Sequence, residues 1–203
     1  MARARVFIDY WNFQLAWNAN VSGRQMCDWR LLPSVLIRER EATLRVAGLA
    51  EPLTLEETIV HASVEAGDGK QRNWFNNFLD RQPSYDVKLR ERRPRQRQIR
   101  SRGCGSETSE CPACGEAFRG AVEKGVDTAI VTDLLSLAWQ GAYDVAILVT
   151  SDADFIPAVE HVQAKGLRVV NAGWPGIGYE LKAACWANFD LARVSGSLCR
   201  STT

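Results

Sequence analysis

The feature that most constrains the fold is an uninterrupted apolar run, Val145–Val149, which two carboxylates follow closely. A short run that is apolar at every position is typical of a strand buried on both faces, as in a parallel sheet. Thr150 and Ser151 end the run, and Asp152 and Asp154 come next. An apolar-periodic segment follows, so the two carboxylates lie where a strand passes into a helix.

The place of Asp152 and Asp154 in the chain points to a ligand site. In open α/β sheets, ligands bind at the carboxyl ends of the strands. Two unpaired anions at a buried edge repel each other, and a divalent cation is the simplest group that stabilises them together. The sequence therefore predicts a cation at this edge of the sheet.

The length and composition of the chain predict one soluble domain over residues 1–203. With 46% apolar and 24% charged residues, the chain can build both a sizeable core and a solvated surface. No apolar run is long enough to span a bilayer, so we expect no membrane partner. An apolar run begins within the first residues and no signal peptide precedes it, which makes the cytoplasm the expected location.

Strands and helices are expected to alternate along the chain. Short apolar or β-branched runs predict further strands at Arg5–Ile8, Glu57–Val64, Tyr85–Leu89, Leu167–Asn171 and Asn188–Arg193. Apolar side chains at helical spacing separate most of them. This alternation predicts an α/β fold with a mostly parallel sheet and right-handed crossovers.

The first strand also ends in a carboxylate. Asp9 closes it, and Asn12 lies three residues on. If this strand neighbours Val145–Val149, Asp9 meets Asp152 and Asp154 at the switch point of the sheet. The resulting site is rich in oxygen ligands.

Asp127 opens the helix that precedes the buried strand, and it extends the same set of carboxylates. A role as helix cap alone would be worth about 1 kcal/mol, and that reading stays open. Asp133 lies six residues later, which is not a same-face helical spacing, so it is a reserve candidate.

The candidate ligands of the predicted site are all oxygens. Such ligands favour Mg²⁺ or Mn²⁺ over zinc. A hard cation among carboxylates suits phosphodiester hydrolysis, because it activates water and stabilises charge on the phosphate and the leaving oxygen.

A strongly basic segment lies between residues 88 and 102, where eight basic residues accompany one acidic residue. Apolar residues are nearly absent after Leu89, so this segment is not expected to form core. It is either a solvated loop or a surface that neutralises phosphates without base specificity. The candidate nucleic-acid-binding residues are Arg92, Arg93, Arg95, Arg97, Arg100 and Arg102.

Three cysteines fall in an insert over residues 91–122: Cys104, Cys111 and Cys114. The Cys-Pro-x-Cys-Gly part is similar to one knuckle of a zinc ribbon, which holds structural Zn²⁺ through four ligands. The candidates for the fourth ligand are water, a glutamate, Cys27, His61 and Cys185. Reduced or redox-active thiols are the alternative.

Large aromatic residues crowd the segment after Asp9: Tyr10, Trp11, Phe13 and Trp17. They suit core packing on a helix face, since large apolar side chains are mostly buried. Base stacking beside a nucleic-acid site is the alternative.

Three motifs together resemble the NYN domains of the PIN-like nuclease superfamily, in its LabA-like bacterial branch. They are Val-Phe-Ile-Asp9-x-x-Asn12, Lys124-Gly-Val-Asp127-x5-Asp133, and Tyr143-Asp-x-Ala-Ile-Leu-Val-Thr-Ser-Asp152-x-Asp154-Phe155 with Lys165-Gly166-x-x-Val169 behind it. One departure is visible, because the family often has glycine where Ser151 stands. We expect the added side chain to narrow the approach of the backbone to a phosphate.

The resemblance implies a Rossmann-like three-layer α/β/α sandwich, with a mostly parallel sheet of five or six strands, and metal-dependent ribonuclease activity. Carried over by position, Asp9, Asp127, Asp152 and Asp154 would hold Mg²⁺ or Mn²⁺ directly or through water. Asn12 would orient Asp9 or a water.

The leading functional hypothesis is therefore a metal-dependent endoribonuclease acting on single-stranded or structured RNA, with DNA left open as a substrate. A non-catalytic RNA-binding or regulatory module on the same fold is the alternative. The third hypothesis is another phosphate enzyme, such as a phosphatase. A phosphatase of that kind would need an Asp-x-Asp pair after the first strand, and Trp11 stands at the place of the second aspartate. A homodimer is compatible with RNA binding, because it would widen the basic surface.

Overall fold

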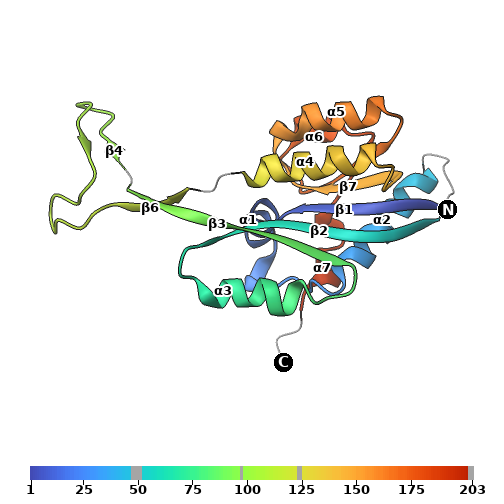
Figure 1. Cartoon of the computed structure of the whole chain (residues 1–203), viewed down its shortest axis with the longest axis horizontal. Coiled ribbons are helices and arrows are strands. Elements are labelled where there is room, and N and C mark those ends of the chain that lie inside the picture. Colours follow the sequence, from blue (N-terminus) through green and yellow to red (C-terminus); the bar gives the residue numbers. More distant parts are fainter. Residues whose placement is uncertain (47–51, 97, 123–124, 201–203) are drawn as a thin grey trace.

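A sheet of seven strands forms the middle layer of the computed structural model of this chain (Figure 1). The structure describes residues 1–46, 52–96, 98–122 and 125–200. The strands of this sheet are β1 (Ala2–Asp9), β2 (Leu53–Glu65), β3 (Tyr85–Gln96), β6 (Arg119–Val122), β7 (Val145–Val149), β8 (Arg168–Gly173) and β9 (Ala187–Asp190). Their order is β6-β3-β2-β1-β7-β8-β9. All pairings are parallel except that of β3 with β6.

Helices cover both faces of the sheet. They are α1 (Tyr10–Asn20), α2 (Leu32–Val46), α3 (Gly69–Trp74), α4 (Val126–Trp139), α5 (Ile156–Ala164), α6 (Tyr179–Ala184) and α7 (Ser195–Leu198). Side chains of α1, α2 and α7 belong to one apolar cluster, and side chains of α4, α5 and α6 belong to a second on the other face. The six parallel strands and the two helical layers confirm the predicted α/β/α sandwich.

The strand β7 is buried at all of its positions, as its sequence predicts. Ile147 and Val149 join the first cluster, while Ala146 and Leu148 join the second. Each fully buried side chain of the size of Leu148 stabilises the fold by about 2 kcal/mol. The strand can therefore only lie in the middle of the sheet, where both of its faces are covered.

The aromatic residues after β1 are mainly core, as one of the two readings of the sequence predicted. Tyr10, Phe13 and Trp17 are buried in the first cluster. Trp11 is half-buried and packs against that cluster from its edge.

The strand β3 is longer than the sequence indicated. It was expected to end at Leu89, but it continues through the basic residues to Gln96. It pairs with β2 as far as Arg92 and then with β6, antiparallel, as a two-stranded ribbon. A two-stranded ribbon at the edge of a sheet can be built from charged residues, because it needs no core of its own.

The ribbon of β3 and β6 carries an arm away from the body of the molecule, on the side of the sheet where β1 and β2 end (Figure 1). The arm contains a second small sheet, the hairpin of β4 (Ile99–Arg100) and β5 (Glu107–Thr108). An isolated bridge between Glu110 and Ala117 closes the next turn of the chain.

Other boundaries differ by a few residues. The strand β2 begins at Leu53 rather than Glu57. The helix α3, which begins at Gly69, passes into a π-helical turn, η2 (Phe75–Leu79). In the part of the chain that the structure describes, no helix is both long and apolar enough to cross a membrane.

Asn171 provides a test of the sheet next to β7. Its side chain is almost fully buried, and its Nδ2 donates to the carbonyls of Leu148 (3.1 Å) and Thr150 (2.8 Å). Replacement by leucine leaves those carbonyls without their donor, so we expect Asn171→Leu to lower the free energy of unfolding by about 1–3 kcal/mol in urea denaturation. The exposed Asn188→Leu is the matched control. Equal stability of the two variants would contradict this role.

Candidate active site

Two aspartates begin helical turns after neighbouring strands: Asp9 ends β1, and Asp152 follows β7 by three residues. Asp9 Oδ1 accepts a hydrogen bond from the backbone N–H of Asn12 (3.2 Å) and caps α1. Asp152 Oδ1 accepts one from the N–H of Asp154 (2.9 Å) and caps the 3-10 turn η3 (Ala153–Phe155). Since β1 and β7 are neighbours, both capped turns lie at the switch point of the sheet.

Hydrogen bonds join the two turns to each other. Thr150 Oγ1 donates to Asp9 Oδ2 (3.5 Å) and accepts from the N–H of Asp152 (3.3 Å). The backbone N–H and the hydroxyl of Ser151 both donate to Asn12 Oδ1, at 2.9 Å each. Asn12 therefore holds the turn after β7 in place through its amide oxygen.

Ser151, the departure from the family pattern, is closely packed. A Cβ atom added at Gly178 would lie 2.9 Å from Ser151 Cβ, and Gly178 has a φ of +67°. Gly178 lies in the loop between β8 and α6, and only glycine fits both the space and the backbone conformation there. This loop therefore closes one side of the site.

The four predicted ligand aspartates differ in exposure. Asp9 is 6% exposed, and Asp152 is half-buried. Asp154 and Asp127 are exposed, the latter in the first turn of α4. Among the described residues, no group of three or more His, Cys, Asp or Glu side chains could hold a metal ion. Ligation of a cation by these four aspartates, directly or through water, therefore stays a prediction.

A looser cation site is chemically consistent with this arrangement. Mg²⁺ usually keeps several waters and binds through one or two carboxylates rather than through a complete protein cage. The donor set at the switch point is oxygen only, with Asp9 and Asp152 joined through Thr150. Such donors fit a hydrated hard cation and not a thiophilic one.

The helix α4 brings Asp127 to the same end of the sheet. It packs against β1, β2 and the turn η3. Gly125, with a φ of +80°, is its N-cap and lies against the guanidinium of Arg90 on β3. Asp127 is therefore inside the first turn rather than at the cap, and Lys124 of the same motif lies outside the described residues.

The reserve candidate Asp133 lies beside a row of polar residues on three neighbouring strands. Asp9, His61 and Lys88 are in register on β1, β2 and β3. Lys88 Nζ contacts Asp133 Oδ2 at 2.7 Å, and His61 Nε2 lies 3.0 Å from the same oxygen. Sequence reasoning missed this row, because the register of strands far apart in sequence is not visible in the chain.

His61 is a buried neutral histidine. Burial disfavours its charged form and lowers its pKa to about 4, and Lys88 and Arg90 act in the same direction, while Asp133 opposes them. Its Nε2 makes no well-directed hydrogen bond among the described residues in spite of the short distance to Asp133. Lys88 is consequently the charged partner of Asp133.

Trp11 and Arg92 stack beside this edge. Trp11 Nε1 donates to the carbonyl of Ser63 (2.8 Å), and Arg92 Nε donates to the Ser63 hydroxyl (2.8 Å). The Arg92 guanidinium lies 4.4 Å from the centre of the Trp11 ring. One face of Trp11 is therefore covered by Arg92 of the basic segment.

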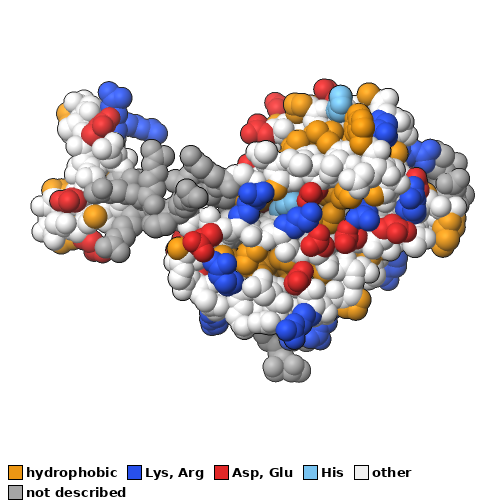
Figure 2. All heavy atoms as spheres, viewed as in Figure 1, with side chains coloured by type: hydrophobic (Ala, Val, Ile, Leu, Met, Phe, Trp, Pro, Cys, Tyr) orange, Lys and Arg blue, Asp and Glu red, His pale blue; other side chains and the backbone are white. Residues whose placement is uncertain are grey.

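Of the other predicted nucleic-acid-binding arginines, Arg93 and Arg95 lie on β3, and Arg100 and Arg102 lie on the arm. Arg100 and Arg102 are exposed. Arg97 lies outside the described residues, as do the side chains of Arg93 and Arg95. On the visible face of the body, basic and acidic side chains alternate (Figure 2). A continuous basic surface is therefore not seen on that face.

The three cysteines of the insert lie on two similar turns. Gly105 N–H donates to the carbonyl of Ser101 (3.0 Å), and Gly115 N–H donates to that of Cys111 (2.8 Å). Hydrogen bonds from Ser101 and Ser106 lower the pKa of Cys104 to about 7. The described cysteines form no metal group, so zinc binding stays a prediction.

Three proposed fourth ligands for that zinc are wrong. Cys27, His61 and Cys185 are all buried in the body of the molecule, whereas the arm projects away from it (Figure 1). None of the three can reach a cysteine on the arm without unfolding.

The comparisons with known proteins agree with this architecture. The family model of the NYN domain matches residues 3–191. The chain belongs to the NYN domain family. This NYN domain is similar to the crystal structure of a protein of unknown function from Vibrio parahaemolyticus, with a TM-score of 0.56 and 17% identity over 94% of this chain and 93% of that one. This likeness supports the fold alone. A comparison with curated proteins gave no match.

The buried His61 makes the stability of the NYN domain depend on pH. Its pKa of about 4 in the folded state lies below the ordinary value of 6.5. Between these values the unfolded chain binds a proton that the folded chain does not. We therefore expect the free energy of unfolding to fall, by up to about 3 kcal/mol, as the pH drops from about 6.5 to about 4.

Urea denaturation across this pH range tests the expectation. His61→Leu should remove the histidine part of the pH dependence, while the exposed His161→Leu should keep it. Parallel pH profiles for His61→Leu and the wild type would show that His61 does not titrate in this way.

Proposed function

We propose that this NYN domain protein is a metal-dependent endoribonuclease that hydrolyses RNA phosphodiester bonds at the carboxyl edge of β1 and β7. Its family is nuclease-related, which supports a hydrolase. The observation that carries the proposal is the hydrogen-bonded link from the Asp9 carboxylate, through the Thr150 hydroxyl, to the backbone N–H of Asp152. Both residues lie at the carboxyl ends of neighbouring strands, and carboxylates at such a switch point are suited to hold a cation.

Asp9 and Asp152 would hold Mg²⁺ or Mn²⁺ directly, and Asp127 and Asp154 would contact it through water. When bound, the cation would supply an activated water and stabilise negative charge on the phosphate. Asn12 keeps the turn after β7 fixed, so that Asp152 holds its position relative to Asp9.

The arm is the proposed contact for the RNA backbone. It leaves the body on the side where β1 and β2 end, which is the side of the carboxylates (Figure 1). Arginines on it would neutralise phosphates and add affinity without reading sequence. The charges of the arm alone favour neither single-stranded nor structured RNA, and DNA would meet the same charges.

A second candidate function is RNA binding without cleavage. It is favoured by one observation, that the described carboxylates form no group of three around a cation position. In that case the capping bonds of Asp9 and Asp152 would be their whole role, and the arm would be the functional centre.

Cleavage of a labelled single-stranded RNA separates the two functions. We expect cutting with Mn²⁺ or Mg²⁺, none with EDTA, and a loss of at least about a hundredfold in Asp152→Asn, since a ligand of the cation is removed. Asp144→Asn is the matched control, because Asp144 lies just before β7, at its other end, where it pairs with Arg3. It should cut like the wild type.

RNA binding without cleavage in any metal, unchanged in Asp152→Asn, would replace the nuclease by the binding module. Activity retained in Asp152→Asn would place the chemistry elsewhere.

The salt dependence of RNA binding tests the arm. Each lost contact with a phosphate should reduce the slope of log affinity against log salt by about 0.7 for a single strand. We expect the double variant Arg100→Gln and Arg102→Gln to lower the slope by more than the control Arg81→Gln, whose exposed arginine lies between η2 and β3. Equal slopes in fluorescence anisotropy titrations would exclude these two arginines from the interface.

A further inference from the structure

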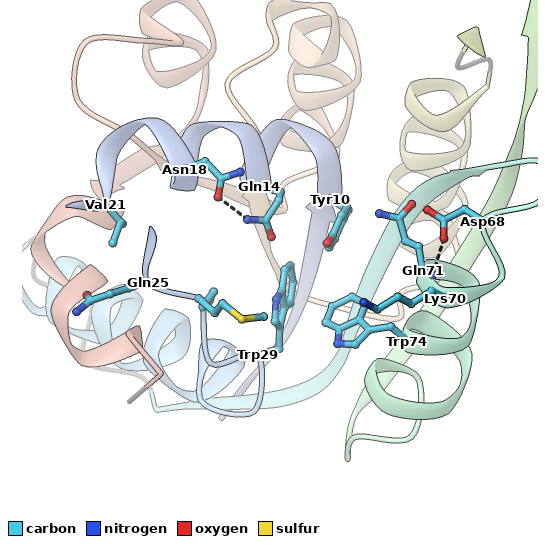
Figure 3. A pocket seen from close by; sticks show the side chains of 12 residues that line it. Tyr10, Gln14, Asn18, Val21, Gln25, Trp29, Asp68, Lys70, Gln71 and Trp74 are labelled. Carbon is cyan, nitrogen blue, oxygen red and sulfur yellow. Dashed lines mark hydrogen bonds between the residues drawn. The ribbon is translucent and has the colours of Figure 1, made fainter. Parts of the chain in front are cut away.

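A pocket of about 710 Å³ lies between α1 and α3, on the face of the sheet away from α4 (Figure 3). Tyr10, Gln14 and Asn18 line it from α1, and Gln71 and Trp74 line it from α3. Its size falls within the range of small-molecule sites. None of the proposed cation ligands lines it.

Aromatic rings form much of its wall. Tyr10 and Trp29 stack with their ring centres 5.4 Å apart, and Trp74 meets Trp29 edge to face at 6.1 Å. Tyr10 and Trp29 are nearly buried, whereas Trp74 is half-buried and so presents part of its ring to the pocket. Flat aromatic surfaces of this kind favour flat rings as ligands.

Side-chain amides provide the polar groups. Gln14 Nε2 donates to Asn18 Oδ1 (2.9 Å), which leaves the oxygen of Gln14 and the NH₂ of Asn18 for a ligand. The side chain of Gln71 points from α3 towards Tyr10, and within the described parts of the chain its amide has no hydrogen bond (Figure 3). Amides offer a donor and an acceptor side by side, which matches the edge of a nucleobase.

The charges at the pocket favour an uncharged ligand. Lys70 and Asp68 both line it and are of opposite sign. Asp68 is already engaged, because its carboxylate caps α3 by accepting from the N–H of Gln71 (2.9 Å). No cluster of cations is present among the described lining residues, so the pocket suits the base of a nucleotide better than its phosphate.

The helix α1 connects the pocket with the candidate active site. Tyr10, part of its wall, follows Asp9 directly in the chain. Both α1 and α3 begin where a strand of the sheet has ended, β1 for the first and β2 for the second. A strand of RNA with one phosphate at the carboxylates can therefore place a neighbouring base beside α1.

We propose that the pocket between α1 and α3 binds one unpaired nucleobase of a single-stranded RNA substrate, next to the phosphate that is cleaved. This inference rests on the proposed nuclease function. It makes the enzyme selective for single strands, because a paired base could not enter the pocket. Trp74 supplies stacking, and Gln71 supplies hydrogen bonds to the edge of the base.

Binding of a short fluorescein-labelled single-stranded RNA, measured by anisotropy in EDTA so that it is not cut, tests the proposal. The base is removed from one position at a time by an abasic substitution. We expect one position at which the wild type loses about tenfold in affinity, as stacking of one base would give. In Trp74→Leu and Gln71→Leu the intact RNA should bind correspondingly more weakly, and the abasic substitution should cause no further loss.

Two exposed residues of α4 and its C-cap provide matched controls, Trp139→Leu and Gln140→Leu. Both should keep the wild-type response to the abasic position. Gln71 makes no side-chain hydrogen bond in the described structure, so Gln71→Leu keeps the test valid even if Trp74→Leu destabilises the fold.

The proposal is overturned if no abasic position weakens binding, or if the loss is the same in Gln71→Leu as in the wild type. Either result would leave the pocket to another occupant, such as a peptide segment. These results are distinct from failure of the nuclease function. Cleavage without a base-dependent position would reject only the pocket, and a base-dependent position without cleavage would reject only the nuclease.

Discussion

The structure depends above all on the parallel pairing of β1 with β7. Both strands are buried on two faces, so a shift of register by one residue would move the side chains of each apolar cluster to the opposite face of the sheet and disrupt the packing of both. With the register fixed, Ile8 lies opposite Val149, and Asp9 and Thr150 are the first polar residues beyond the core on their strands. The packing of apolar side chains therefore decides where the carboxylates are.

The two carboxylates that cap the turns are also the candidate ligands of the cation. The carboxylates of Asp9 and Asp152 accept from the first N–H groups of the turns that follow them, where the helix dipole favours negative charge. These bonds orient the two side chains. The cost of placing anions together is offset by local hydrogen bonds, and each carboxylate has a second oxygen that its cap does not use.

The sequence predicted the parts of the site that depend on local pattern, and missed those that depend on distant pairing. The apolar runs located β1 and β7 and the aspartates after them. The length of β3 could not be read from the chain, because its basic half is held by β6, which lies beyond the whole arm. The place of His61 beside Asp9 and Lys88 was missed for the same reason, since this row exists only once three strands are aligned.

The connection between the arm and the body allows the arm to be deleted from the sequence. Its two connections to the body are the paired strands of one ribbon, in which Gln96 lies opposite Arg119. A two-residue β-hairpin turn of the Asn-Gly type joins antiparallel strands at such a point. The chain between these two residues can thus be cut out and the ends rejoined, which yields a body that keeps its sheet and its carboxylates but has lost the arm.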